Sequence, residues 1–93
     1  MKLVYIVRMG NDIVFAGLTL ESVYDYLKED FKPLPYYDVY SLQIIHQDEF
    51  SGFNIYNLKM YNENTCSYDL IDDYTLVIGG LDGFDFDWKG KIY

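Results

Sequence analysis

The chain has 93 residues, of which 51% are hydrophobic and 19% aromatic, and its formal net charge at pH 7 is −8. This length and composition predict a single domain over residues 1–93 with one hydrophobic core, and they exclude an intrinsically disordered chain. The strong negative charge argues against direct binding to nucleic acid phosphates or to anionic lipid, so the expected partners are neutral or basic.

The expected compartment is the cytoplasm. Cys66 is the only cysteine, which excludes an internal disulfide. The first residues do not have the pattern of a secretory signal, and the uncharged stretches are shorter than the roughly 20 apolar residues that cross a bilayer.

A β-hairpin is predicted at the start of the chain. Residues 2–9 and 13–18 are rich in β-branched and aromatic side chains, which favour strands, and Gly10-Asn11-Asp12 between them has turn chemistry. Apolar side chains occupy both sets of alternating positions in residues 2–9. We therefore expect this strand to be buried largely on both faces.

The next element is predicted to be a helix over residues 20–31. Thr19 is a suitable N-cap, and Pro33 and Pro35 end the helix because proline lacks a backbone donor and disfavours helical geometry in the preceding residue. The apolar side chains that recur at helical spacing are Leu20, Val23, Tyr24, Leu27 and Phe31.

The remainder of the chain is predicted to be rich in strands. Residues 37–47 and 53–61 form a second hairpin around Ser51-Gly52, and shorter strands cover residues 66–70 and 74–78 with a turn at Asp72-Asp73. Gly79-Gly80 is expected to break the last strand. The final segment from Gly83 alternates aromatic and charged residues, and is either an edge strand or an arm docked on the core. The fold class is therefore α+β: a single antiparallel sheet of about five to seven strands with one helix packed on one face, in the order ββα then β-rich.

The residues with catalytic chemistry are few. His46 is the only histidine and is interpreted as a structural or surface residue in a strand, while Cys66 has no neighbouring base and is interpreted as a buried, inert thiol. The spacing of Asp82, Asp85 and Asp87 lacks the central glycine and terminal glutamate of a calcium-binding loop. The sequence therefore predicts a protein that is not an enzyme and that uses no metal and no cofactor.

Two features favour binding to a partner. The chain has eleven tyrosines, more than one core accommodates with satisfied hydroxyls, and residues 69–87 contain six aspartates and no base. In a strand, Asp85 and Asp87 would project from one face about 6.7 Å apart, roughly twice the charge spacing along one DNA strand. The alternative interpretations are β-propensity for the tyrosines and solubilising loops for the aspartates. The predicted partner-binding residues are Asp69, Asp72, Asp73, Asp82, Asp85, Asp87, Tyr56, Tyr61, Tyr68 and Trp88.

The opening stretch VYIVRMGNDIVFAGLTLESVYDYL, residues 4–27, resembles small accessory proteins of phages and mobile elements. Small size, acidity and abundant tyrosine are also similar to the inhibitors that such elements use against host nucleases, including anti-CRISPR proteins and DNA mimics. This resemblance implies no catalytic residues, and it places the protein in the cytoplasm of a host bacterium.

The function expected from these observations is inhibition without catalysis. The partner would be a host defence nuclease with a basic nucleic-acid-binding groove, first of all a type II CRISPR effector, with no direct contact to nucleic acid or membrane. One alternative is a small structural or accessory domain that self-associates as a homodimer through an exposed strand edge. Another is a sponge for a signalling nucleotide, although phosphate sites usually recruit more Arg and Lys than this chain offers.

Overall fold

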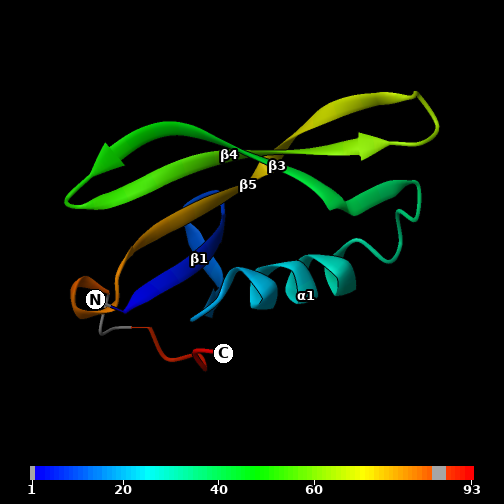
Figure 1. Ribbon diagram of the computed structural model, residues 1–93. Coiled ribbons are helices and arrows are strands. Elements are labelled where there is room, and N and C mark those ends of the chain that lie inside the picture. Colours follow the sequence, from blue (N-terminus) through cyan, green and yellow to red (C-terminus); the bar gives the residue numbers. More distant parts are fainter. Residues whose placement is uncertain (1, 85–87) are drawn as a thin grey trace.

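The computed structural model describes residues 2–84 and 88–93. Within this part of the chain, five antiparallel strands form one sheet in the order β2-β1-β5-β4-β3, and one α-helix packs against it (Figure 1). This arrangement confirms the predicted α+β class and the order ββα then β-rich. The elements are β1 (Leu3–Met9), β2 (Asp12–Gly17), α1 (Leu20–Asp30), β3 (Tyr37–Phe50), β4 (Phe53–Asn62), β5 (Ser67–Gly80) and the short 3-10 helix η1 (Leu81–Gly83).

Helix α1 begins and ends where the sequence predicts, to within one residue. The Thr19 side-chain oxygen accepts a hydrogen bond from the backbone N–H of Ser22 at 3.2 Å, which satisfies one of the unpaired donors of the first turn. Val23 and Leu27 are fully buried against the sheet, and Phe31 is the C-cap residue. The apolar stripe read from the sequence is therefore the face that α1 buries.

Both faces of the sheet contribute to the core. On the inner face, which α1 covers, the strand residues Val7, Leu58, Met60 and Leu76 pack with the apolar stripe of the helix. The outer face, on the opposite side, has a smaller buried cluster of Val4, Ile6, Ala16, Val77 and Phe84. Because β1 contributes to both clusters, its predicted burial on two faces is confirmed.

The last described residues, 88–93, form an arm docked on the outer cluster. Trp88 and Ile92 pack against this cluster. The backbone of Tyr93 donates to Ala16 O at 2.9 Å and accepts from Leu18 N at 2.8 Å, so the arm also covers part of the free edge of β2. Of the two readings of the final segment, the docked arm is correct for these residues, whereas the predicted site residues Asp85 and Asp87 lie outside the described part of the chain.

The prediction of two separate strands after residue 65 is wrong, because both belong to the single strand β5. Pairing between β4 and β5 is interrupted between Leu70 and Thr75, and β5 pairs with β1 from Tyr74 onward. Asp72 and Asp73 are exposed in this interruption, as turn residues would be, yet the strand continues through them. Before the interruption β5 therefore pairs with β4 alone, and after it β5 pairs with both β4 and β1.

Gly79-Gly80 does not break the last strand, contrary to expectation. Gly79 pairs with Val4 and Gly80 with Leu3. A Cβ atom at position 79 would lie 2.2 Å from Cδ1 of Phe53, so this glycine makes room for an aromatic ring on the sheet. Its role is close packing and not chain reversal.

Strand β3 extends to Phe50, three residues beyond its predicted end. Ser51 and Gly52 both have positive φ values, 53° and 82°, which is the geometry of a two-residue hairpin turn. Such a turn lets Phe50 and Phe53 pair directly, and the strand continues to the turn.

Candidate functional site

A cavity of about 410 Å³ lies between the C-terminal end of α1 and the interruption in β5. Asp30 from the helix and Asp72 and Asp73 from the strand are three of its lining residues, so it is called the acidic cavity below. The Tyr74 hydroxyl donates a hydrogen bond to the Asp30 carboxylate, which ties the end of the helix to β5. Carboxylates that are far apart in the sequence therefore surround one hollow.

Tyr74 is held as a neutral hydrogen-bond donor at this site. Burial disfavours the charged phenolate, and the carboxylate of Asp30 both accepts a hydrogen bond from the hydroxyl and would repel the phenolate charge. Both effects raise the pKa of Tyr74. The ring also packs against Phe31 at 5.8 Å between centroids, so the residue anchors α1 as well as lining the cavity.

Asp69 lies next to this cavity but is engaged within the fold. Its Oδ2 atom accepts hydrogen bonds from Asn62 Nδ2 and from the Tyr37 hydroxyl, each at 2.9 Å. These bonds, the one from Asn62 first, lower the pKa of Asp69, and the bond to Asp69 raises the pKa of Tyr37. Of the predicted partner-binding acids that the structure describes, Asp69 is therefore the one with a clear structural role.

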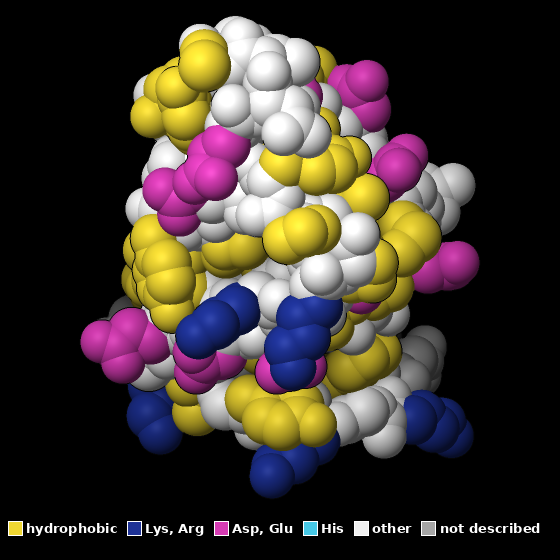
Figure 2. Space-filling view, turned by 90° about the vertical axis from the view of Figure 1, so that its right-hand side faces the viewer, with side chains coloured by type: hydrophobic (Ala, Val, Ile, Leu, Met, Phe, Trp, Pro, Cys, Tyr) yellow, Lys and Arg dark blue, Asp and Glu magenta, His cyan; other side chains and the backbone are white. Residues whose placement is uncertain are grey.

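The remaining described acid of the predicted site lies elsewhere. Asp82 is exposed in η1, beyond the other end of β5, and residues 74–80 between them span about 20 Å at the rise of an extended strand. Figure 2 shows the side of the molecule that carries the turn between β4 and β5 and the C-terminal end of α1, and there acidic groups are interspersed with hydrophobic and neutral ones and, in the middle and lower part of the view, with Lys or Arg side chains. The aspartates of the described segment thus form a local group at residues 69–73 and a distant one at Asp82.

The predicted aromatic residues fall into three places. Tyr61 and Tyr68 are paired across β4 and β5 with ring centroids 5.5 Å apart, and Tyr68 remains 45% exposed. Tyr56 points to the inner face, where its ring packs edge-on against His46 at 5.4 Å. Trp88 belongs to the arm and is half-buried against the outer cluster. The Tyr61–Tyr68 pair is therefore the predicted aromatic surface that a partner can reach.

His46 and Cys66 lie outside the acidic cavity, and Cys66 is a neighbour of Tyr61. His46 is exposed on β3, and its Nε2 is 3.1 Å from the Asn54 side-chain oxygen. Cys66 is exposed in the turn between β4 and β5, so the expectation of a buried thiol is wrong: the turn gives it a positive φ of 53° and keeps its side chain outside the sheet. No three His, Cys, Asp or Glu side chains within residues 2–84 and 88–93 are grouped so as to hold a metal ion.

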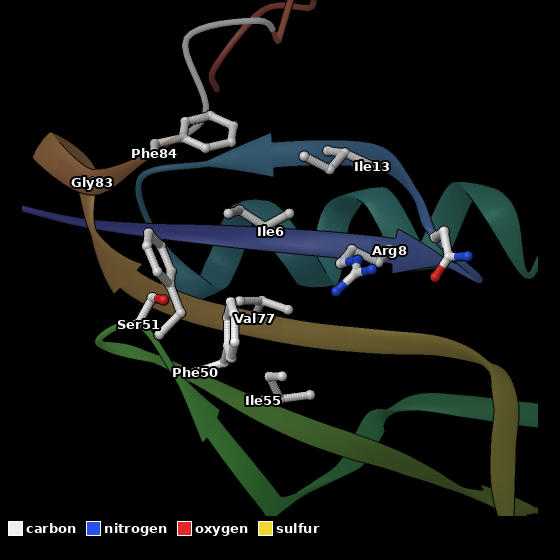
Figure 3. Close-up of a pocket in the computed structure, with 11 residues that line it drawn as sticks. Ile6, Arg8, Ile13, Phe50, Ser51, Ile55, Val77, Gly83 and Phe84 are labelled. Carbon is white, nitrogen blue, oxygen red and sulfur yellow. The ribbon is translucent and has the colours of Figure 1, made fainter.

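A second cavity, of about 400 Å³, lies on the outer face (Figure 3). It is called the apolar cavity below, because most of its lining is aliphatic or aromatic. The sheet forms its floor, Phe84 and Gly83 stand on one side, and Phe50 and Ser51 from the turn between β3 and β4 stand on the other. Arg8 projects from β1 into the same region.

Comparison with known proteins gives no relative. No protein-family model matches the chain, and neither a curated protein nor a solved structure is significantly similar to it. In the described residues, no helix has the length and apolar character needed to cross a membrane. The two cavities and the charges around them are therefore the features of the molecule to which a function can be assigned.

Three residues of these surfaces were not singled out from the sequence. Asp30 reaches the acidic cavity through its bond with Tyr74, which is 44 positions away, and no local pattern indicates such a contact. Phe50 lies beyond the predicted end of its strand, so the sequence does not assign it to a face of the sheet. Arg8 fits the alternation of its strand. The sequence feature that could have indicated its role in a site is a basic residue within a strand whose neighbouring residues are apolar.

Proposed function

We propose that this protein is a non-enzymatic inhibitor that binds a basic, nucleic-acid-binding surface of a host defence nuclease. Type II CRISPR effectors are the first target class to test. The observation that carries the proposal is the acidic cavity, where Asp30, Asp72 and Asp73 surround one hollow beside the hydroxyls of Tyr37 and Tyr74.

Uncompensated charge at this cavity supports the proposal. Asp72 and Asp73 are exposed, and in the described chain the one ion pair joins Lys32 to Glu29, at 2.8 Å. Unpaired carboxylates accelerate association with a basic groove and add little to the stability of the free protein. Tyrosine beside them supplies contact area with little loss of side-chain entropy.

The test compares two double variants with the same total charge. Asp72→Asn with Asp73→Asn alters the acidic cavity, whereas Asp48→Asn with Glu49→Gln removes two exposed acids near the turn between β3 and β4. Each raises the net charge by two. Association rates with purified nucleases, and inhibition of DNA cleavage, are measured between low and high salt.

We expect the variant at residues 72 and 73 to associate more slowly than the control. Its association rate should also depend less on salt, because fewer charges remain at the interface for salt to screen. Equal association rates for the two double variants would refute a role for the acidic cavity. Failure of the wild-type protein to inhibit any nuclease of the panel would refute the function itself.

The absence of catalysis is tested separately. His46→Ala and Cys66→Ser should retain full inhibition, because each side chain is exposed and lies outside the acidic cavity. Loss of inhibition by either variant, with an unchanged circular dichroism spectrum, would contradict the non-enzymatic proposal.

Self-association is the second candidate function, and one observation favours it. β2 and β3 are the two edges of the sheet, and the arm covers part of β2, whereas no described strand pairs with the outer side of β3. An uncovered edge strand is a template for pairing with a second chain. Sedimentation equilibrium distinguishes the two functions, because a monomer at micromolar concentration excludes a stable dimer through β3.

A further inference from the structure

The apolar cavity has the construction of a small-molecule site. Its floor is formed by Ile6 of β1, Val77 of β5 and Ile55 of β4, which are neighbours across the sheet on the outer face. Its volume of about 400 Å³ is within the range of sites that enclose small ligands, which are mostly apolar with a few convergent polar groups.

The charged group of the cavity is Arg8. It is half-buried, and it makes neither an ion pair nor a side-chain hydrogen bond within residues 2–84 and 88–93. A guanidinium beside apolar side chains has lost part of its hydration, which an anion bound between the same walls would replace. Figure 3 shows Arg8 on the same side of β1 as Ile6 and facing Val77, so the charge borders the apolar floor.

We propose that the apolar cavity binds a small amphipathic carboxylate, a medium-chain fatty acid or an aryl alkanoate, whose apolar body lies on Ile6, Ile55 and Val77. Its carboxylate pairs with the guanidinium of Arg8, which is suited to two parallel hydrogen bonds with a carboxylate. This site is separate from the acidic cavity and is independent of the proposed inhibition.

The number of charges favours a carboxylate over a phosphate monoester, which carries close to two negative charges at pH 7. Among the described residues that line the cavity, Arg8 is the one cation, while the chain as a whole carries a net charge of −8. A ligand with one negative charge is compensated by one guanidinium, whereas a dianion would be repelled by the remaining charge of the protein. A neutral apolar ligand would cover Arg8 and leave it without a partner.

The test is a titration of methyl-labelled protein with octanoate and, separately, with 1-octanol, followed by NMR. Saturable shifts are expected at the methyl groups of Ile6, Ile13, Ile55 and Val77, which line the cavity. Octanoate should bind about tenfold more tightly than the alcohol, the effect of one good charge-assisted pair.

Three variants separate the contributions to binding. Arg8→Gln should remove the preference for octanoate, and Lys59→Gln, a charge change on the same strand as Ile55 but outside the cavity lining, should retain it. Phe50→Ala should weaken both ligands alike, and because this side chain is 72% exposed, the variant should fold normally.

Several results would overturn the proposal. These are the absence of saturable shifts at the cavity methyl groups, equal affinity of the wild-type protein for octanoate and octanol, and a preference that survives Arg8→Gln. The same methyl shifts on concentrating the protein without ligand would show that a second copy occupies the cavity, which would also refute a small-molecule site.

Discussion

Substitution of Leu27 by alanine tests how much of the stability depends on the attachment of α1 to the sheet. Leu27 is fully buried in the inner core, where a Leu→Ala change removes buried methyl groups and leaves a cavity. The expected loss is about 2 to 5 kcal/mol, a large part of the roughly 5 to 15 kcal/mol that stabilises a typical domain. In a domain of this size, it corresponds to a melting temperature lower by about 8 °C or more.

Urea unfolding followed by circular dichroism measures this loss, and Leu70→Ala is the matched control. Leu70 is the same residue type but is 48% exposed on the outer face, so its truncation should change the unfolding free energy by less than about 0.5 kcal/mol. A Leu27→Ala protein as stable as the control would show that the helix face is not a core surface, and would refute the packing described above.

Two further predictions concern the hydrogen bonds near the acidic cavity. Asp69→Ala should destabilise the fold more than Asp72→Ala, because it leaves Asn62 Nδ2 without its acceptor. The lowered pKa of Asp69 stabilises the fold above the usual carboxyl range, and this stabilisation is lost as pH falls, so the unfolding free energies of the wild type and of Asp69→Ala, measured in urea, should converge in acid. Tyr74→Phe should destabilise the fold at pH 7, because it removes the hydrogen bond to Asp30. The raised pKa of Tyr74 stabilises the fold below about pH 10 and less as pH rises further, so the unfolding free energies of the variant and the wild type should approach each other in alkali. A difference in unfolding free energy that does not change with pH would contradict this assignment.

The elements with local signals could be predicted from the sequence. The first hairpin depends on a turn at Gly10-Asn11 between two β-branched segments, and α1 depends on the Thr19 cap and an apolar stripe that is buried as expected. Such signals lie within a few residues of the structure that they specify.

The parts that could not be predicted depend on contacts between distant residues. Asp72-Asp73 has the composition of a turn, yet β5 continues through these residues, because it pairs with β4 before them, up to Leu70, and with β1 after them, from Tyr74. The bonds from Tyr37 to Asp69 and from Tyr74 to Asp30 join positions 32 and 44 residues apart. The sequence therefore shows that acids and tyrosines are abundant, but which of them are in contact depends on how the strands pair in the sheet.

The strand order also determines when during synthesis this protein is able to fold. β1, the first strand of the chain, lies between β2 and β5, and Leu3 pairs with Gly80. The inner core is therefore incomplete until β5 has left the ribosome, and until then one side of β1 in the first hairpin is unpaired. Pairing over such sequence separations places the domain among slower folders than helical proteins of the same length.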